Sequence, residues 1–192
     1  MERIRSFIAI ELPNPLQQAL DQLESRLKTD RQPDVKWVSP ASIHLTLKFL
    51  GSISADLVAE ITRAIGAAAP GTVPFRLRTG ALGVFPNPKR VQVVWVGLEG
   101  ELDKLNHLQQ KLETSLAPLG FPPEGRRFTP HLTLARLRDR ASAAEREEMG
   151  KLVAETRLDD ATEITVDAVS LMKSELTRAG PVYTRISRVE LK

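Results

Sequence analysis

The order of apolar and polar positions along the chain predicts strands alternating with helices. Residues 3–12 carry apolar side chains on both faces, which indicates a strand in the middle of a sheet. Leucines at helical spacing follow through about residue 30. The same patterns predict further helices at 54–69, from 101 and at 142–155, and further strands at 35–38, from 44, 73–85, 91–98, from 131, 162–173 and 181–191. Together these elements indicate an α+β protein.

Two of the predicted strands open with the same four residues, His-Leu-Thr-Leu. The first copy begins at His44 and the second at His131, although the chain has only three histidines. Side chains two positions apart on a strand point to the same face. His44 therefore projects with Thr46, and His131 projects with Thr133. The alternating leucines, continued by Phe49 in the first copy, are predicted to face a core.

The elements after each His-Thr strand come in the same order, a helix and then two strands. The repeat units run from about 44 to 98 and from about 131 to 191. We interpret residues 1–192 as a single bilobal α+β domain, made of two similar lobes that each contain an antiparallel sheet and helices. Both His-Thr faces are expected to meet in the cleft between the lobes, which is the expected active site.

Composition places the chain among ordinary globular proteins. Its 192 residues are 42% hydrophobic and 27% charged, with no apolar run long enough to cross a membrane and no signal-peptide pattern. The absence of cysteine excludes a disulfide framework and thiolate metal sites. We therefore expect a cytoplasmic protein with no membrane partner. The net charge of +3 favours anionic partners but is too small to establish nucleic-acid binding.

Two imidazoles on opposite sides of a phosphate provide a general acid and a general base together, because the ordinary pKa of histidine is about 6.5. Hydrolysis of a cyclic phosphodiester needs both groups. One takes a proton from water, and the other gives a proton to the departing ribose oxygen. The hydroxyls of Thr46 and Thr133 would donate to the non-bridging oxygens, where charge collects in the transition state. This chemistry requires no metal and no cofactor.

Other interpretations of these residues remain open at this point. A single His-Thr pair on a strand is most often structural, but a structural histidine has no reason to recur with its threonine. A metal site made from His44 and His131 would lack a third ligand. His107 lies in a predicted helix without a threonine two positions later, and we expect it on the surface. A serine-nucleophile motif of the form G-x-S-x-G is absent.

The two motifs match the pattern H-x-[ST]-x that occurs twice in the two-histidine phosphoesterase superfamily. The chain resembles the RNA 2′,3′-cyclic phosphodiesterases of that superfamily, also called LigT-like proteins or 2′-5′ RNA ligases. The resemblance covers nearly the whole chain. The segments that carry it read RSFIAIELP, KWVSPASIHLTLKFLG, NPKRVQVVWVGL and FTPHLTLARL.

The resemblance implies a fold with a pseudo-twofold axis and hydrolysis of a terminal RNA 2′,3′-cyclic phosphate to a 2′-phosphomonoester. It makes His44 the proton donor and His131 the proton acceptor, whereas the residues alone leave that direction open. Reversible 2′-5′ joining of RNA, with the two roles exchanged, is also implied. The expected partners are RNA ends that carry the cyclic phosphate, such as tRNA halves, or nucleotides. We expect the protein to act as a monomer.

Residues outside the motifs are weaker candidates. Lys48 shares the His44 face by alternation, and either contacts phosphate or is solvated. Arg136 falls on the face opposite His131 in a regular strand, so it reaches substrate only after a bulge or at the strand end; otherwise it forms an ion pair. Phe85 either stacks on a base or packs in a core. Arg90, Arg126, Arg127 and Lys173 are candidates for phosphate contacts, with ordinary surface charge as the alternative.

Two further functions compete with RNA-end hydrolysis. The same chemistry could act on a small cyclic mononucleotide, and rates on a mononucleotide and on a longer RNA would separate these substrates. The other is a catalytically silent module that binds nucleotide or RNA. Such a module would be expected to lose one of the two histidines, whereas this chain retains both.

Overall fold

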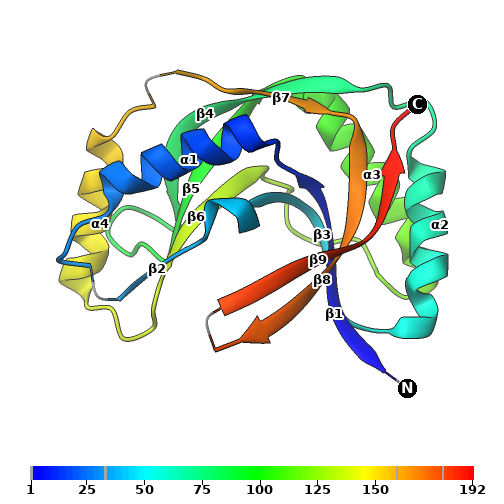
Figure 1. The fold of residues 1–192 in the computed structure, drawn as a ribbon, viewed down its shortest axis with the longest axis horizontal. Coiled ribbons are helices and arrows are strands. Elements are labelled where there is room, and N and C mark those ends of the chain that lie inside the picture. The colour runs from blue at the N-terminus through cyan, green and yellow to red at the C-terminus, as the bar shows by residue number, and fades with distance from the viewer. Residues whose placement is uncertain (1, 33, 159, 179) are drawn as a thin grey trace.

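The computed structural model describes residues 2–32, 34–158, 160–178 and 180–192. Its strands form two antiparallel sheets, one of four strands and one of five (Figure 1). Across the first sheet the strands are β3 (His44–Ser54), β1 (Arg3–Glu11), β8 (Ala168–Thr177) and β9 (Gly180–Glu190). Across the second they are β2 (Val35–Trp37), β6 (His131–Leu137), β5 (Val93–Gly100), β4 (Phe75–Phe85) and β7 (Glu163–Val166). Each sheet contains one His-Thr strand.

Helices cover the outer side of each sheet. The helices are α1 (Asn14–Leu27), α2 (Val58–Ala68), α3 (Leu102–Leu116) and α4 (Ala143–Glu155). The pair α2 and α3 packs against the four-stranded sheet, and α1 and α4 lie beside the five-stranded sheet (Figure 1). We call the four-stranded sheet with α2 and α3 the first lobe, and the five-stranded sheet with α1 and α4 the second lobe. The bilobal α+β architecture predicted from the sequence is confirmed.

The path of the chain between the lobes differs from the simplest reading of the repeat. After each His-Thr strand comes a helix, which is followed by two strands in the first half (β4 and β5) but by three in the second half (β7, β8 and β9). Neither sheet consists of one repeat unit. Hairpin β4–β5 lies in the sheet of the second motif, and hairpin β8–β9 lies in the sheet of the first. The single strand predicted over 162–173 is also wrong. The chain breaks at Asp167, and the two resulting strands, β7 and β8, belong to different sheets.

Leucine spacing in the helices explains how the lobes are sealed. On α1 the side chains of Leu16, Leu20, Leu23 and Leu27 are at most 1% exposed, as the helical spacing predicts.

Helix α4 begins with the predicted capping box. The Ser142 hydroxyl accepts from the Glu145 backbone N–H at 3.2 Å, and the Ser142 N–H donates to the Glu145 carboxylate at 2.7 Å.

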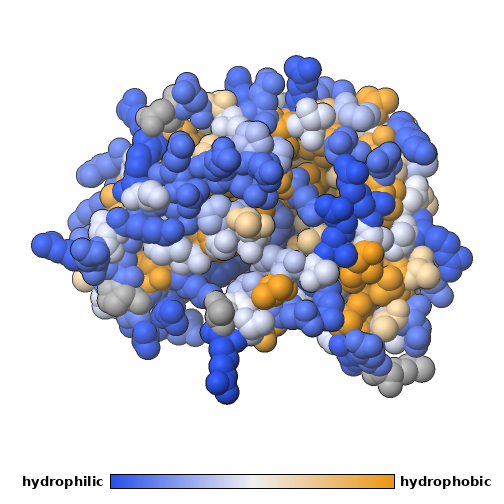
Figure 2. Space-filling model, viewed as in Figure 1, coloured by the Kyte–Doolittle hydropathy of each residue, from blue (hydrophilic) through white to orange (hydrophobic). Residues whose placement is uncertain are grey.

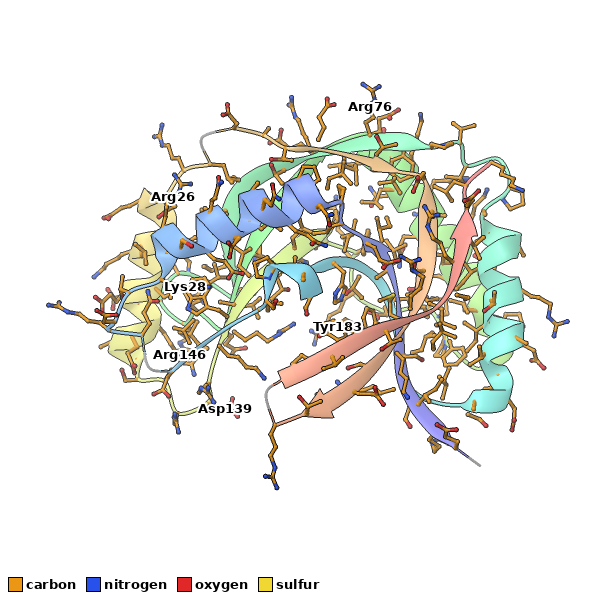
Figure 3. All side chains as sticks on the ribbon, in the orientation of Figure 1. Arg26, Lys28, Arg76, Asp139, Arg146 and Tyr183 are labelled. Carbon is orange, nitrogen blue, oxygen red and sulfur yellow. The ribbon has the colours of Figure 1, made fainter. Side chains whose placement is uncertain are left out.

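Arg146 of α4 connects the end of β6 to the segment that precedes β5. Its guanidinium donates to the backbone carbonyls of Val91 at 2.7 Å and Arg138 at 2.9 Å (Figure 3). The Val91 carbonyl gains a partner through this contact, and the Arg138 carbonyl, which also accepts from the Ala141 N–H at 2.9 Å, gains a second one. The strand that carries His131 is thereby held at its far end.

The surface facing the viewer in Figure 2 is mainly hydrophilic, with apolar side chains in small groups. The large exposed apolar side chains are Phe49, Val73, Leu176 and Val182. In the described parts of the chain, no helix combines the length and the apolar character needed to cross a bilayer.

Candidate active site

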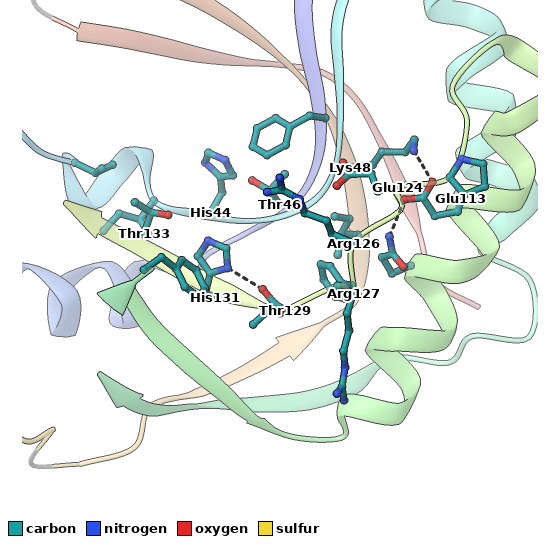
Figure 4. Close-up of a pocket in the computed structure, with 18 of the residues that line it drawn as sticks. His44, Thr46, Lys48, Glu113, Glu124, Arg126, Arg127, Thr129, His131 and Thr133 are labelled. Carbon is teal, nitrogen blue, oxygen red and sulfur yellow. Dashed lines mark hydrogen bonds and ion pairs between the residues drawn. The ribbon is translucent and has the colours of Figure 1, made fainter. Parts of the chain in front are cut away.

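The two His-Thr strands meet at a cleft between the lobes. Strands β3 and β6 contact each other there, and the cleft has a volume of about 920 Å³. His44, Thr46, His131 and Thr133 all line it, and Figure 4 shows both imidazoles in the same space with the two threonines beside them. The structure thus brings together the four residues that the sequence singled out.

Both histidines are oriented by the same backbone contact. Nδ1 of His44 lies 2.9 Å from the carbonyl oxygen of Ser42, and Nδ1 of His131 lies 2.7 Å from the carbonyl oxygen of Thr129. In each case the carbonyl belongs to the residue two positions before the histidine. A carbonyl oxygen only accepts, so Nδ1 carries a hydrogen on both rings. Nε2 is therefore the atom of each imidazole that can gain or lose a proton.

Aromatic rings enclose His44. The ring of Phe7 stacks on the imidazole with centroids 4.5 Å apart, and Tyr183 meets it edge-on at 5.0 Å. Tyr183 reaches this position from β9 (Figure 3). Burial lowers the pKa of His44 below its ordinary value, and the positive charge of Arg136 lowers it further, while the hydrogen bond to Ser42 acts in the opposite direction. Free of ligand, His44 is therefore biased toward the neutral form.

His131 has a different aromatic neighbourhood. Phe85 meets its ring edge-on at 5.1 Å, and Trp95 lies behind at 6.3 Å. Trp95 lies across the sheet over Gly83, where an added Cβ would approach the indole to 2.2 Å. Only glycine at position 83 leaves room for the indole in this place. Phe85 is half-buried, lines the cleft and packs on Trp95 at 5.0 Å, so it is not a core residue, and its stacking on a base stays a prediction.

A β-bulge follows the threonine in each motif. In the pairing of β1 with β3, Thr46 and Lys48 face consecutive partners and Leu47 is skipped. In the pairing of β5 with β6, Thr133 and Ala135 do so and Leu134 is skipped. A bulge inserts one residue and so reverses which face the following side chains take.

The first bulge overturns two predictions made from strict alternation. Phe49 was expected in the core, but it is 63% exposed and lies on the cleft face with His44. Lys48 was expected to contact phosphate or to be solvated, but it is 3% exposed and its ammonium group forms an ion pair with Glu113 of α3. The second bulge is the feature that Arg136 required. Arg136 lines the cleft with His131 and Thr133.

Two of the four remaining candidates for phosphate contacts line the cleft, and two do not. Arg126 and Arg127 line the cleft. Among the described residues that form the cleft wall, neither Arg90 nor Lys173 is included, and Lys173 instead forms an ion pair with Glu175 at 2.9 Å. His107 is exposed on α3, as predicted.

Sequence reasoning missed the aromatic residues that hold His44, because they are distant in the sequence. Phe7 comes from β1 and Tyr183 from β9, and the pairing of these strands with β3 and β8 is not readable from local patterns. One signal was available for Tyr183. It is the only tyrosine in the chain, and it occurs within a polar strand. A lone tyrosine there has no core to fill, and this favours a role in a site.

Comparison with known proteins identifies the family. The family model described as the 2′-5′ RNA ligase superfamily matches residues 12–178. The chain belongs to this superfamily. Similar proteins include the RNA 2′,3′-cyclic phosphodiesterase of Methanothermobacter thermautotrophicus, which is 34% identical over 95% of this chain and 96% of its own length. The protein of the same name from Aeropyrum pernix is 35% identical over 81% of this chain and 86% of its own length.

Solved structures of similar proteins agree with the fold. A protein of Thermus thermophilus superposes with a TM-score of 0.79 at 28% identity, covering 98% of both chains. E. coli LigT complexed with 3′-AMP superposes with a TM-score of 0.76 at 25% identity, covering 99% of both chains. The resemblance inferred from the two motifs is therefore confirmed.

Proposed function

We propose that this protein hydrolyses RNA 2′,3′-cyclic phosphate ends to 2′-phosphomonoesters, with His44 and His131 as the acid and base. The observation that carries the proposal is the cleft itself, in which two imidazoles present Nε2 from opposite lobes. The relatives of this chain described above are named RNA 2′,3′-cyclic phosphodiesterases. Superfamily membership and cleft geometry support the same reaction.

The proton transfers balance with these two groups alone. Nε2 of His131 takes a proton from a water molecule whose oxygen attacks phosphorus. The bond from phosphorus to the ribose O3′ breaks, and Nε2 of His44 gives O3′ a proton. The product keeps the phosphate on O2′. In the joining direction, the 5′-hydroxyl of a second RNA takes the place of water: His131 takes its proton, the bond from phosphorus to O3′ breaks, and His44 again protonates O3′. The two imidazoles therefore keep their roles in joining, against the expectation, and exchange them only in the reverse cleavage of the 2′-5′ bond.

The lowered pKa of His44 is compatible with its role as the acid once substrate is bound. An anionic phosphate next to the ring favours the imidazolium, which opposes the effects of burial and Arg136. Bound substrate therefore favours the protonated form of His44, which later donates this proton to the ribose O3′. The residues alone leave this direction open, and the assignment of acid and base rests on the family resemblance.

Thr46, Thr133 and Arg136 would stabilise the phosphate. Each lines the cleft on the same strand face as its histidine. Among the described residues, Arg136 forms no salt bridge, so its guanidinium is available to an anion. A threonine hydroxyl and a guanidinium both donate to non-bridging oxygens, on which negative charge grows during the reaction.

The proposal is tested with an RNA oligonucleotide that ends in a 2′,3′-cyclic phosphate. His44→Ala and His131→Ala should each lower kcat by a factor of about 10²–10⁴, the usual contribution of a positioned acid or base. His107→Ala is the matched control, because this third histidine is exposed on α3 outside the cleft. Undiminished turnover in both cleft variants would refute the mechanism. Tight binding of the RNA without product in the unmodified protein would instead favour a silent binding module.

A further inference from the structure

The cleft continues past the two motifs toward helix α3. Beyond Thr46 its wall is formed on one side by α3, with Gln110 and Thr114, and on the other by the segment that contains Arg126 and Arg127. At about 920 Å³ the cleft is near the upper end of the range for small-molecule sites, roughly 300–1,000 Å³. Space therefore remains next to the place where the cyclic phosphate would react.

A buried polar network fixes the floor of this part of the cleft. Lys48 pairs with Glu113 and donates to the carbonyl oxygen of Pro122 at 2.9 Å. Gln109 donates to the other carboxylate oxygen of Glu113 at 2.9 Å. Buried charges are tolerated when they are paired and hydrogen-bonded, as they are here. The network ties β3, α3 and the 122–127 segment together, so the two walls are held apart at a set distance before any ligand arrives.

The walls offer groups that match one nucleotide. Gln110 and Thr114 are exposed and one helical turn apart on α3, and the amide of Gln110 supplies both donors and an acceptor. Across the cleft, Arg126 and Arg127 form no ion pair or hydrogen bond with the described residues. Glu124 is the carboxylate on that wall, and Glu113 is neutralised by Lys48.

The two arginines point in different directions. Figure 4 shows Arg126 extending toward Thr46, whereas Arg127 extends away from the two histidines. Arg126 is thus near the reaction centre, and Arg127 is placed for an anion farther along the cleft. At a cyclic RNA end, the chain continues only through the 5′ oxygen of the last ribose, so the next phosphate lies about one nucleotide from the reacting phosphorus.

We propose that Gln110, Thr114 and Arg127 form a subsite for the nucleotide that precedes the cyclic end, with Arg127 on the connecting phosphodiester and the α3 side chains on the base or ribose. The subsite rests on the proposed function, because it places the reacting phosphate between the two imidazoles. It makes the protein selective for RNA ends over free cyclic mononucleotides. Gln110, Thr114 and Arg127 are specificity residues and take no part in the proton transfers.

The test compares two substrates that end in the same group, adenosine 2′,3′-cyclic phosphate and the dinucleotide ApA with a 2′,3′-cyclic phosphate. The unmodified protein should show a higher kcat/KM on the dinucleotide. Arg127→Ala and the double variant Gln110→Ala/Thr114→Ala should each lower kcat/KM on the dinucleotide about tenfold, the effect of losing one charge-assisted or two neutral hydrogen bonds. On the mononucleotide both variants should stay within about twofold of the unmodified protein.

Arg63→Ala is the matched control, since Arg63 is an exposed arginine on α2 outside the cleft. Equal losses on both substrates, or no loss on either, would overturn the subsite. Equal kcat/KM of the unmodified protein on both substrates would do the same. If it turns over neither substrate, the proposed function fails instead. Calorimetry with ApA 3′-phosphate and 3′-AMP then decides the subsite separately: it stands only if the variants weaken binding of the dinucleotide alone.

Discussion

The two motif strands, β3 and β6, share their geometry and differ in what surrounds it. Each starts with a histidine whose Nδ1 donates to a carbonyl two residues earlier, and each bulges at the fourth residue of the motif. The fifth residue after each histidine therefore returns to the cleft face. That residue is Phe49 on β3 and Arg136 on β6.

The environments of the two imidazoles are not equivalent. His44 is stacked against Phe7 and capped by Tyr183, whereas His131 has the edge contact of Phe85. The lowered pKa of His44 follows from this closer burial and from Arg136, which comes from the other lobe. The duplicated backbone thus supplies two proton-transfer groups, and the unequal surroundings decide how readily His44 holds its proton. Groups from both lobes therefore determine the pKa of His44.

The largest expected effect comes from removing both imidazoles together. If they act on one phosphate as a unit, His44→Ala/His131→Ala should lose little more activity than the worse of the two single variants, a factor of about 10²–10⁴. Single-turnover rates on a cyclic-ended RNA measure the three variants side by side. If the loss in the double variant equals the product of the losses in the two single variants, the two imidazoles act independently and do not form one catalytic unit.

A smaller effect is expected at the two threonines. Thr46→Val and Thr133→Val keep the shape of the side chain and remove the hydroxyl, so each should lower kcat by about 10- to 100-fold with a smaller change in KM, because the hydroxyls act on charge that develops in the transition state. Circular dichroism and thermal unfolding serve as folding controls. A rise in KM at constant kcat would mean that the hydroxyls bind the ground state only. Unequal losses of kcat at the two positions would show which lobe contributes more to stabilising the phosphate in the transition state.

Local patterns were enough to predict the two motif faces and the helices. The alternation of Leu45 with Thr46, and of Leu132 with Thr133, identifies buried and cleft-facing positions, and the structure agrees, with both leucines at most 2% exposed. Leucine spacing likewise predicted α1. These features depend on the period of side chains within one element, which is written in the sequence.

The rest depends on contacts between distant segments. Alternation gave the wrong surroundings for Lys48 and Phe49 because the bulge at Leu47 is set by pairing with β1, and the sequence of β3 alone does not reveal it. The exchange of hairpins between the lobes was missed for a similar reason. Asp167 is the only residue between β7 and β8, and nothing in the local pattern of 162–173 indicates that the chain changes sheets there.

The smallest expected effect concerns the charge that Arg136 places beside His44. Arg136→Met removes this positive charge and keeps much of the side-chain volume, so the pKa of His44 should rise. It should stay below the ordinary value of about 6.5, because burial is the larger cause and persists in the variant. The resonances of the His44 ring, followed by NMR from pH 4 to 8, measure this shift directly. Arg63→Met and Phe49→Met are the matched controls. The first removes a charge outside the cleft, and the second changes the equivalent position on β3 without changing charge. A shift of the His44 titration in either control that matched the shift in Arg136→Met would show that Arg136 does not act through its charge, and the proposed coupling between the lobes would fail.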